Sequence, residues 1–111
     1  MPKLRRVDPE RGKELLESIK KFAEELRAKL PVKEVYLYGS FATGEIHEGS
    51  DIDLLVIGDF RERIFERIGK VLDLTELPIE PLVYTVEEFE GMKASQNPFI
   101  ENVLKTAIRL I

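Results

Sequence analysis

The chain has 111 residues, a length that suits one domain spanning residues 1–111 and leaves little room for a second. Hydrophobic residues make up 43%, which excludes a disordered chain, and the absence of cysteine excludes disulfides, thiolate zinc sites and a cysteine nucleophile. The formal net charge of −4 argues against duplex DNA as a partner, and no apolar run approaches the roughly 18 residues of a membrane-spanning helix.

The first predicted element is a long amphipathic helix. Asp8 and Pro9 begin it, because Asp caps helix N-termini and Pro suits the first helical position. Apolar residues then recur at helical spacing from Leu15 to Leu30, and Pro31 ends the pattern. We therefore expect one face of this helix to pack against the rest of the domain.

Two short strands come next. Residues 35–38 are β-branched and aromatic and run directly into Gly39, which indicates a buried strand that stops at a turn. Residues 52–57 form a second apolar strand. Tyr36 and Tyr38 alternate with apolar neighbours on the first strand, so we expect them to be packing residues.

A helix and a third strand are predicted in the second half of the chain. The helix covers residues 61–74, and five apolar side chains are expected on its inward face: Ile64, Phe65, Ile68, Val71 and Leu72. Residues 79–85 form the third strand. Pro81 lies inside it and cannot donate a backbone hydrogen bond, which favours a position at the edge of a sheet.

Two helices complete the chain. Thr85 and Glu88 form a capping box for a helix over residues 86–94, and Asn97 and Pro98 begin the last helix. The apolar face of that last helix is expected to contain Phe99, Val103, Leu104, Ala107 and Ile108. The order of elements predicts an α/β (α+β) fold, in which a small mixed β-sheet of three to four strands is flanked by helices.

Two carboxylates stand at the start of the second strand. Because residues two apart in a strand point to the same side, Asp51 and Asp53 project together, while Ile52 and Leu54 point toward the core. Like charges so close repel each other unless a cation lies between them, and oxygen ligands without His or Cys suit Mg²⁺ or Mn²⁺. The alternative is a strand-entry cap, which explains Asp51 easily and Asp53 poorly, because Asp disfavours strands.

Gly39 and Ser40 follow the first strand. A glycine at this point lets backbone N–H groups approach a phosphate, the next turn can present a helix N-terminus, and Ser40 adds a hydroxyl donor. The alternative is an ordinary turn glycine. A phosphate cradle and a dicarboxylate metal site belong together chemically, because Mg²⁺ bridges phosphate oxygens. The sequence therefore indicates a metal–nucleotide site at these strand ends.

At these residues the sequence resembles a known family. Tyr-Gly-Ser-Phe-Ala-Thr-Gly at residues 38–44 and Gly-Ser-Asp-Ile-Asp-Leu-Leu-Val at residues 49–56 are similar to the motifs of the minimal nucleotidyltransferases (MNT) of the DNA polymerase β-like superfamily. These are small prokaryotic proteins that are often encoded beside a HEPN-domain protein as a toxin–antitoxin pair. The detailed resemblance covers residues 35–57, and the order of helices and strands extends it loosely over the whole chain.

The resemblance implies a polymerase β-like nucleotidyltransferase fold and transfer of a nucleotide through two Mg²⁺ ions, or Mn²⁺, with ATP as substrate. Asp51 and Asp53 would hold both ions and act as catalytic residues. A third carboxylate from a later strand normally completes the metal site, and Glu80 matches that place. Family members often have Asp there, and the alternative for Glu80 is a solvent-facing residue on a sheet edge.

The resemblance also implies nucleotide contacts from Gly39, Ser40 and Ser50. Many family members carry a basic residue inside the Gly-Ser segment, whereas Phe41 and Thr43 are uncharged here. Less positive charge near the phosphates favours weak or narrow activity.

The function implied is that of an antitoxin enzyme in the cytoplasm, which transfers AMP from ATP to a tyrosine hydroxyl of a partner HEPN toxin. The chain has no room for a domain that holds a large acceptor, so the partner would supply most of the acceptor's surroundings. The alternatives are a nucleotide- or metal-binding antitoxin that neutralises its partner by masking it, and a nucleotide or metal sensor. The apolar C-terminal face offers surface for a partner or a homo-oligomer. The 34% of charged residues, with only three amide side chains, hint at a thermophilic source.

Overall fold

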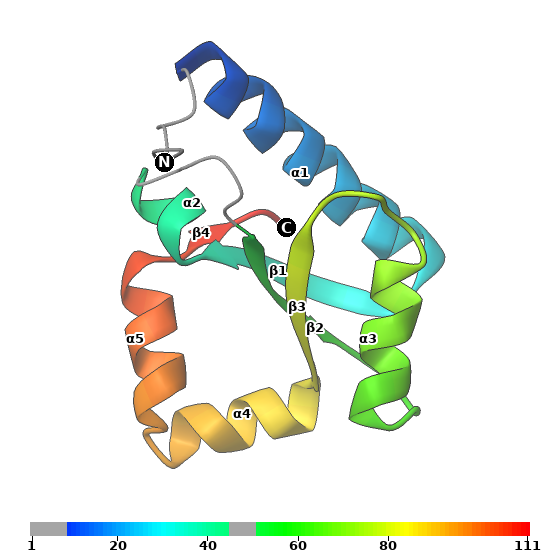
Figure 1. Ribbon diagram of the computed structural model, residues 1–111. Coiled ribbons are helices and arrows are strands. Elements are labelled where there is room, and N and C mark those ends of the chain that lie inside the picture. The colour runs from blue at the N-terminus through cyan, green and yellow to red at the C-terminus, as the bar shows by residue number, and fades with distance from the viewer. Residues whose placement is uncertain (1–8, 45–50) are drawn as a thin grey trace, which may run out of the picture.

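The computed structural model describes residues 9–44 and 51–111, and Figure 1 shows their arrangement. The predicted nucleotide-binding residue Ser50 and the predicted helix cap Asp8 lie outside the described residues. In chain order the elements are α1 Pro9–Lys29, β1 Val32–Tyr38, α2 Ser40–Thr43, β2 Ile52–Gly58, α3 Ile64–Leu72, β3 Ile79–Thr85, α4 Val86–Ala94, α5 Pro98–Thr106 and β4 Ile108–Arg109. None of the described helices is long and apolar enough to cross a membrane.

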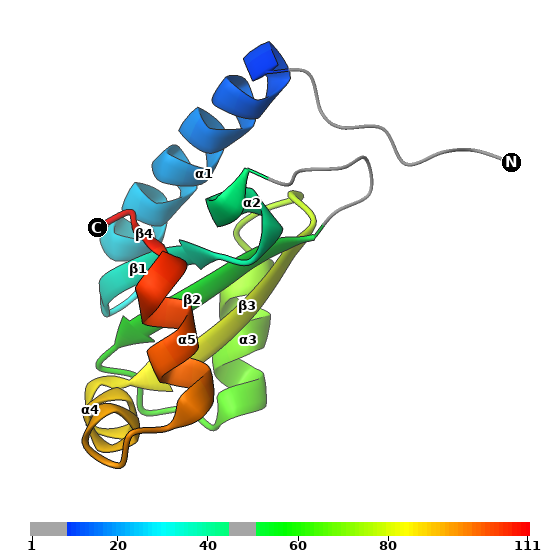
Figure 2. The ribbon, with the colours of Figure 1, turned by 90° about the vertical axis from the view of Figure 1, so that its left-hand side faces the viewer.

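The four strands form one mixed sheet in the order β3-β2-β1-β4. Strand β1 pairs antiparallel with both β2 and β4, whereas β2 pairs parallel with β3. In Figure 2 the strands lie between α1 on one side and α4 with α5 on the other. The predicted fold class, a small mixed sheet flanked by helices, is therefore confirmed.

Both faces of the sheet are covered, so β2 is buried on both sides. Leu54 and Val56 pack on the face that α1 and α3 cover, and Leu55 and Ile57 pack on the face that α4 and α5 cover. All four side chains are fully buried. Burial on both faces explains why β2 has a continuous apolar run rather than an alternating one.

Helix α3 differs from the prediction in its length and in the face that it buries. The prediction of residues 61–74 was too long, since α3 spans Ile64–Leu72. Phe65 is 83% exposed, and Leu72 is exposed as well. The reason is that Arg67 and Val71, four residues apart, form the buried stripe, and Phe65 lies outside it. The face of α3 that packs against the domain is therefore the one that contains Arg67, which the apolar pattern did not indicate.

The last helix is also shorter than predicted. Helix α5 ends at Thr106, and Ile108 and Arg109 form β4, which pairs with Tyr36 and Leu37 of β1. Apolar residues spaced three and four apart suit a helix, so the pattern did not separate Ile108 from the helical face. The first strand is longer than predicted, because it begins at Val32.

The outer edge of β3 is blocked against pairing with another strand. Pro81 has no N–H, and its predicted position at a sheet edge is confirmed because β3 is the first strand of the sheet. The Val83 carbonyl accepts a hydrogen bond from Arg67 Nη1 at 3.4 Å, and the Thr85 N–H donates to Glu88 Oε1 at 2.8 Å. These side chains occupy backbone groups that would otherwise invite an added strand.

Glu88 connects the start of α4 to α3. Its carboxylate completes the predicted capping box with Thr85 and accepts a 2.7 Å hydrogen bond from Arg67 Nη1, whose side chain is buried. Burial raises the pKa of Glu88, but hydrogen bonds from the Thr85 amide and from Arg67 outweigh it and hold the pKa below its ordinary value. The ionised carboxylate therefore stabilises the fold.

We expect Glu88→Gln to lower the free energy of unfolding by about 2 kcal/mol, because it weakens the cap and leaves the buried Arg67 without its carboxylate. Since the folded pKa is lowered, this stabilisation is present at neutral pH and is lost as the pH falls below about 4.5, the ordinary value. Urea titrations between pH 3 and pH 7 measure both effects. Glu87→Gln, on the same helical turn, is the control, and an equal loss in both variants would contradict the assignment.

Candidate active site

A transverse row of three polar side chains crosses the sheet at the beginning of β2. Tyr38 of β1 is the register partner of Asp53, and Asp53 is the register partner of Glu80 in β3. Residues directly opposite each other on neighbouring strands point to the same face. The row therefore lies on the face that α4 and α5 cover farther along the strands, while Ile52 and Leu54 are fully buried on the opposite face.

Three carboxylates meet at this row. The Glu80 carboxyl lies within hydrogen-bonding reach of both Asp51 and Asp53. The hydrogen bond with Asp51 and the repulsion from it raise the pKa of Glu80, with smaller contributions from burial and Asp53. Burial raises the pKa of Asp53, a hydrogen bond from Glu80 partly offsets this, and the charge of Asp51 raises the pKa further. The fold therefore holds these acidic groups together against their mutual repulsion.

The chemistry of this donor set fits a divalent cation. All the donors are carboxylate oxygens, which Mg²⁺ and Mn²⁺ prefer, and a cation would relieve the repulsion that raises these pKa values. Within residues 9–44 and 51–111, no three acidic or histidine side chains are arranged so that together they could hold an ion. Asp51 and Glu80 are exposed, so their side chains are free to turn from each other toward an ion.

Gly39 brings the end of β1 directly against the carboxylates. Its backbone has φ 74° and ψ −152°, a left-handed conformation that favours glycine. A Cβ at this position would overlap Asp53 Oδ2 and would lie 3.2 Å from Asp53 Cγ. The turn and the carboxylate can be this close only because residue 39 has no side chain.

Helix α2 begins immediately after Gly39, at Ser40. The first N–H groups of a helix have no acceptor within the helix, so they can bind an anion such as a phosphate. Phe41 packs against the hydrophobic core, and Thr43 Oγ1 donates to backbone oxygens of Gly39 and Ser40 at 3.4 and 3.3 Å. The side chains of α2 therefore add no positive charge, and within this helix the groups that could contact a phosphate are its first backbone N–H groups and the Ser40 hydroxyl.

Tyr38 is the member of the row whose position the sequence did not reveal. It packs as expected, with its ring edge-on to Phe99 at a centroid distance of 5.9 Å. Burial raises the pKa of Tyr38 to about 12, and Asp53, Tyr84 and Glu80 add to the effect. Its phenol therefore stays protonated at neutral pH and can donate a hydrogen bond next to the carboxylates. The signal in the sequence was its place one residue before Gly39.

Comparisons with known proteins agree with this fold and with the position of the motifs. The sequence model of the family described as "Nucleotidyltransferase domain" matches residues 19–109. Two proteins of Methanocaldococcus jannaschii, each named "putative protein adenylyltransferase", are similar in sequence. One is 30% identical over 92 residues, which are 83% of this chain and 89% of the relative. The other is 42% identical over 91 residues, which are 79% of this chain and 89% of the relative.

The fold also matches a solved structure. The crystal structure of a "putative nucleotidyltransferase" from Sulfolobus solfataricus aligns with a TM-score of 0.65 and 26% sequence identity. The alignment covers 90% of this chain and 82% of that chain. The family match over residues 19–109 includes all four strands and the segment that carries Gly39 and Asp53.

Proposed function

The chain belongs to the nucleotidyltransferase domain family, and from this premise we propose that it transfers AMP from ATP to a tyrosine hydroxyl of a partner HEPN toxin and so acts as an antitoxin. The observation that carries the proposal is that Asp53 lies directly opposite Glu80 and against the turn at Gly39. Asp51 is close enough to raise the pKa of both carboxyl groups. The names of the two archaeal relatives support a protein as the acceptor. The HEPN partner follows from the resemblance to minimal nucleotidyltransferases.

The residues have distinct roles in the proposed reaction. Asp51, Asp53 and Glu80 would hold the divalent ions, while Gly39 and Ser40 would contact the terminal phosphates. When bound, Mg²⁺ would neutralise charge on the triphosphate and on the leaving pyrophosphate. The ions and the α2 amides together would replace the positive side chain that the Gly-Ser segment lacks.

The transfer itself is a substitution at the α-phosphorus of ATP. The acceptor hydroxyl oxygen forms a bond to the α-phosphorus, and the bond from that phosphorus to the oxygen bridging to the β-phosphate breaks. Pyrophosphate leaves, and the proton of the hydroxyl passes to a carboxylate of the site, a role that we assign to Glu80.

The proposal predicts that a HEPN-domain protein is encoded beside this chain, and the test uses that protein. The two proteins are incubated with ATP and Mg²⁺, and intact mass spectrometry should show the partner gaining AMP units. A chelator should abolish the gain, and tandem mass spectrometry should place it on a tyrosine. If the partner is neutralised without any gain in mass, the chain acts by masking instead.

We expect Mg²⁺ together with a non-hydrolysable ATP analogue to stabilise the fold. At a concentration 100-fold above the dissociation constant, the gain is about 2.7 kcal/mol, which raises the melting temperature by about 10 °C in a domain of this size. Differential scanning fluorimetry measures the shift. EDTA should abolish it, and an equal shift with the analogue in EDTA would contradict a role for the metal.

A further inference from the structure

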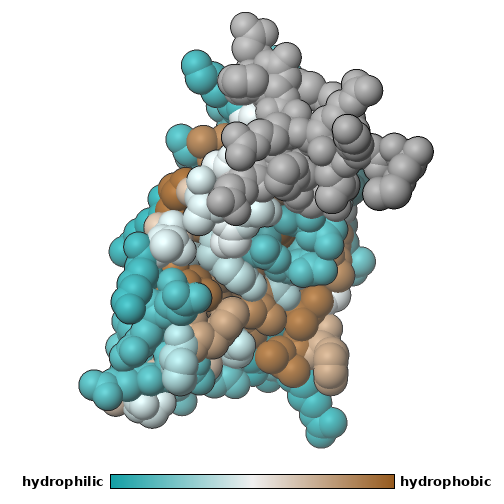
Figure 3. Space-filling view, turned by 60° about the vertical axis from the view of Figure 1, so that its left-hand side comes forward, coloured by the Kyte–Doolittle hydropathy of each residue, from teal (hydrophilic) through white to brown (hydrophobic). Residues whose placement is uncertain are grey.

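Tyr38 stands at one end of the row that it forms with Asp53 and Glu80, and its ring is held by the first turn of α5. The ring is half-buried and packs edge-on against Phe99 at a centroid distance of 5.9 Å. Phe99 is 44% exposed, so the pair lies at the surface of the molecule. Figure 3, which views the molecule from the side of α5, shows hydrophilic and hydrophobic residues next to each other on this face. The Tyr38 ring is therefore fixed by packing at a surface that a ligand can reach.

The Tyr38 hydroxyl lacks a partner among the described residues. Within residues 9–44 and 51–111, no oxygen accepts a hydrogen bond from it. The phenol of Tyr36, two residues earlier on the same face of β1, donates to Glu34 Oε1 at 2.8 Å. Because a partly buried tyrosine hydroxyl usually has a hydrogen-bond partner, a bound substrate is a suitable acceptor for the one at Tyr38.

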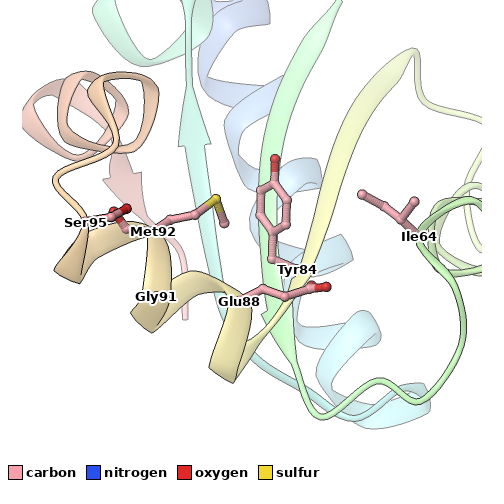
Figure 4. A pocket seen from close by; sticks show the side chains of 6 residues that line it. All are labelled: Ile64, Tyr84, Glu88, Gly91, Met92 and Ser95. Carbon is pink, nitrogen blue, oxygen red and sulfur yellow. The ribbon is translucent and has the colours of Figure 1, made fainter.

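The surroundings of this hydroxyl carry no positive charge in the part of the chain that the structure describes. Burial raises the pKa of Tyr38 to about 12, and Asp53 of β2 with Tyr84 and Glu80 of β3 add to the effect, so these groups lie near the hydroxyl. Figure 4 shows the Tyr84 ring extending away from α4, with its hydroxyl at the far end. No described lysine or arginine acts on the pKa of Tyr38, Asp53 or Glu80. The row therefore offers an anion a neutral hydroxyl in place of a charged side chain.

The order of the row relates its two ends to different substrates. Neighbouring strands are about 4.8 Å apart, so roughly 10 Å separate the backbones of Tyr38 in β1 and Glu80 in β3, with Asp53 between them. In the proposed reaction Glu80 receives the proton of the acceptor hydroxyl, which puts the acceptor at the Glu80 end. The α-phosphate would lie at the ions that Asp51 and Asp53 hold. Tyr38 directly precedes Gly39, which would contact the terminal phosphates, so the Tyr38 end of the row faces the nucleotide.

We propose that the Tyr38 hydroxyl donates a hydrogen bond to a non-bridging oxygen of the α-phosphate of the bound nucleotide. The proposal rests on the proposed adenylyl transfer and adds a residue that contacts the nucleotide. A neutral donor suits this place, because it stabilises charge on the phosphate without pairing with the carboxylates that the ions need. Packing against Phe99 fixes the donor before the nucleotide binds, which lowers the entropic cost of binding.

The test uses Tyr38→Phe, which removes the hydroxyl and keeps the ring that packs against Phe99. We expect this variant to bind α,β-methylene-ATP in the presence of Mn²⁺ about 10- to 100-fold more weakly, the range for a lost hydrogen bond to a charged group. The kcat/KM for ATP should fall by a similar factor, and the KM of the acceptor should stay unchanged. Isothermal titration calorimetry measures the affinity for the analogue. Binding of Mn²⁺ alone, followed by electron paramagnetic resonance, should equal that of the natural protein.

Tyr36→Phe is the matched control, because it removes a hydroxyl from the same face of β1 that is already bonded to Glu34. This variant should bind the analogue as tightly as the natural protein does. Unchanged affinity in Tyr38→Phe, or an equal loss in Tyr36→Phe, would overturn the proposal. A matching loss in the binding of Mn²⁺ alone would also overturn it, because Tyr38 would then act through Asp53. If the natural protein binds the analogue but transfers no AMP, the proposed transfer fails, and calorimetry still decides whether Tyr38 contacts the nucleotide.

Discussion

Asp53→Asn is expected to reduce AMP transfer by about 10³-fold, or ~4 kcal/mol in the free energy of the transition state. The substitution keeps the shape of the side chain but removes a negative charge from the centre of the carboxylate row, where Asp53 adjoins Glu80 in register. Without that charge we expect the site to hold a divalent cation more weakly. A radiolabelled-ATP assay with saturating Mg²⁺ measures the loss.

The same variant should fold at least as well as the natural protein. Burial and the charge of Asp51 raise the pKa of Asp53, so its ionised form is unfavourable in the folded state. Asp59→Asn is the matched control, because Asp59 follows the other end of β2 and its side chain makes an exposed 3.2 Å ion pair with Lys33. Comparable activity in the two variants would remove Asp53 from the catalytic site. A large loss of stability in Asp53→Asn would make its loss of activity a folding effect.

Much of the sheet could be predicted because β2 and β3 have short apolar runs that end at turn residues. The register between these strands could not be predicted, because no local pattern shows which residue of β3 lies opposite Asp53. Glu80 was singled out as the acidic residue inside the third strand, and the structure places it directly opposite Asp53. Its position beside two aspartates is thus a property of the folded sheet, while its role as a metal ligand stays a prediction.

The predictions that were wrong, for α3 and for the end of α5, concern residues whose environment depends on distant parts of the chain. Arg67 is buried because Val83, Glu62 and Glu88 supply oxygen acceptors for its guanidinium, and this arrangement leaves Phe65 exposed on the outer side of α3. Ile108 leaves the helical pattern because an edge of β1 is open to it. The spacing of apolar residues describes a single helix or strand. It cannot show that a residue will instead form contacts with another part of the chain.

Strand β3 holds Glu80 at an edge of the sheet. Its first half places Glu80 directly opposite Asp53, and Pro81, the next residue, cannot donate a hydrogen bond to an added strand. A substitution that shifts β3 along β2 would therefore be expected to move Glu80 away from Asp53.

Gly39→Ala is expected to reduce AMP transfer at least 100-fold. An alanine Cβ would overlap Asp53 Oδ2, so either the carboxylate or the turn that leads into α2 must move. The backbone conformation, with φ 74° and ψ −152°, is adopted readily only by glycine and adds a cost of about 1–3 kcal/mol for any residue with a Cβ. Both the rate of transfer and the free energy of unfolding should therefore decrease.

Gly44→Ala separates these two effects. Gly44 ends the same short helix in an αL conformation, with φ 82° and ψ 5°, and no atom of the described residues lies within 4 Å of a Cβ built there. We expect urea titration to show a loss of about 1–2 kcal/mol for Gly44→Ala, with transfer activity close to that of the natural protein. The extra loss of activity in Gly39→Ala then measures the displacement of Asp53 and of the turn at residue 39. If the two variants lose the same activity, the close contact between Gly39 and Asp53 is not required for transfer.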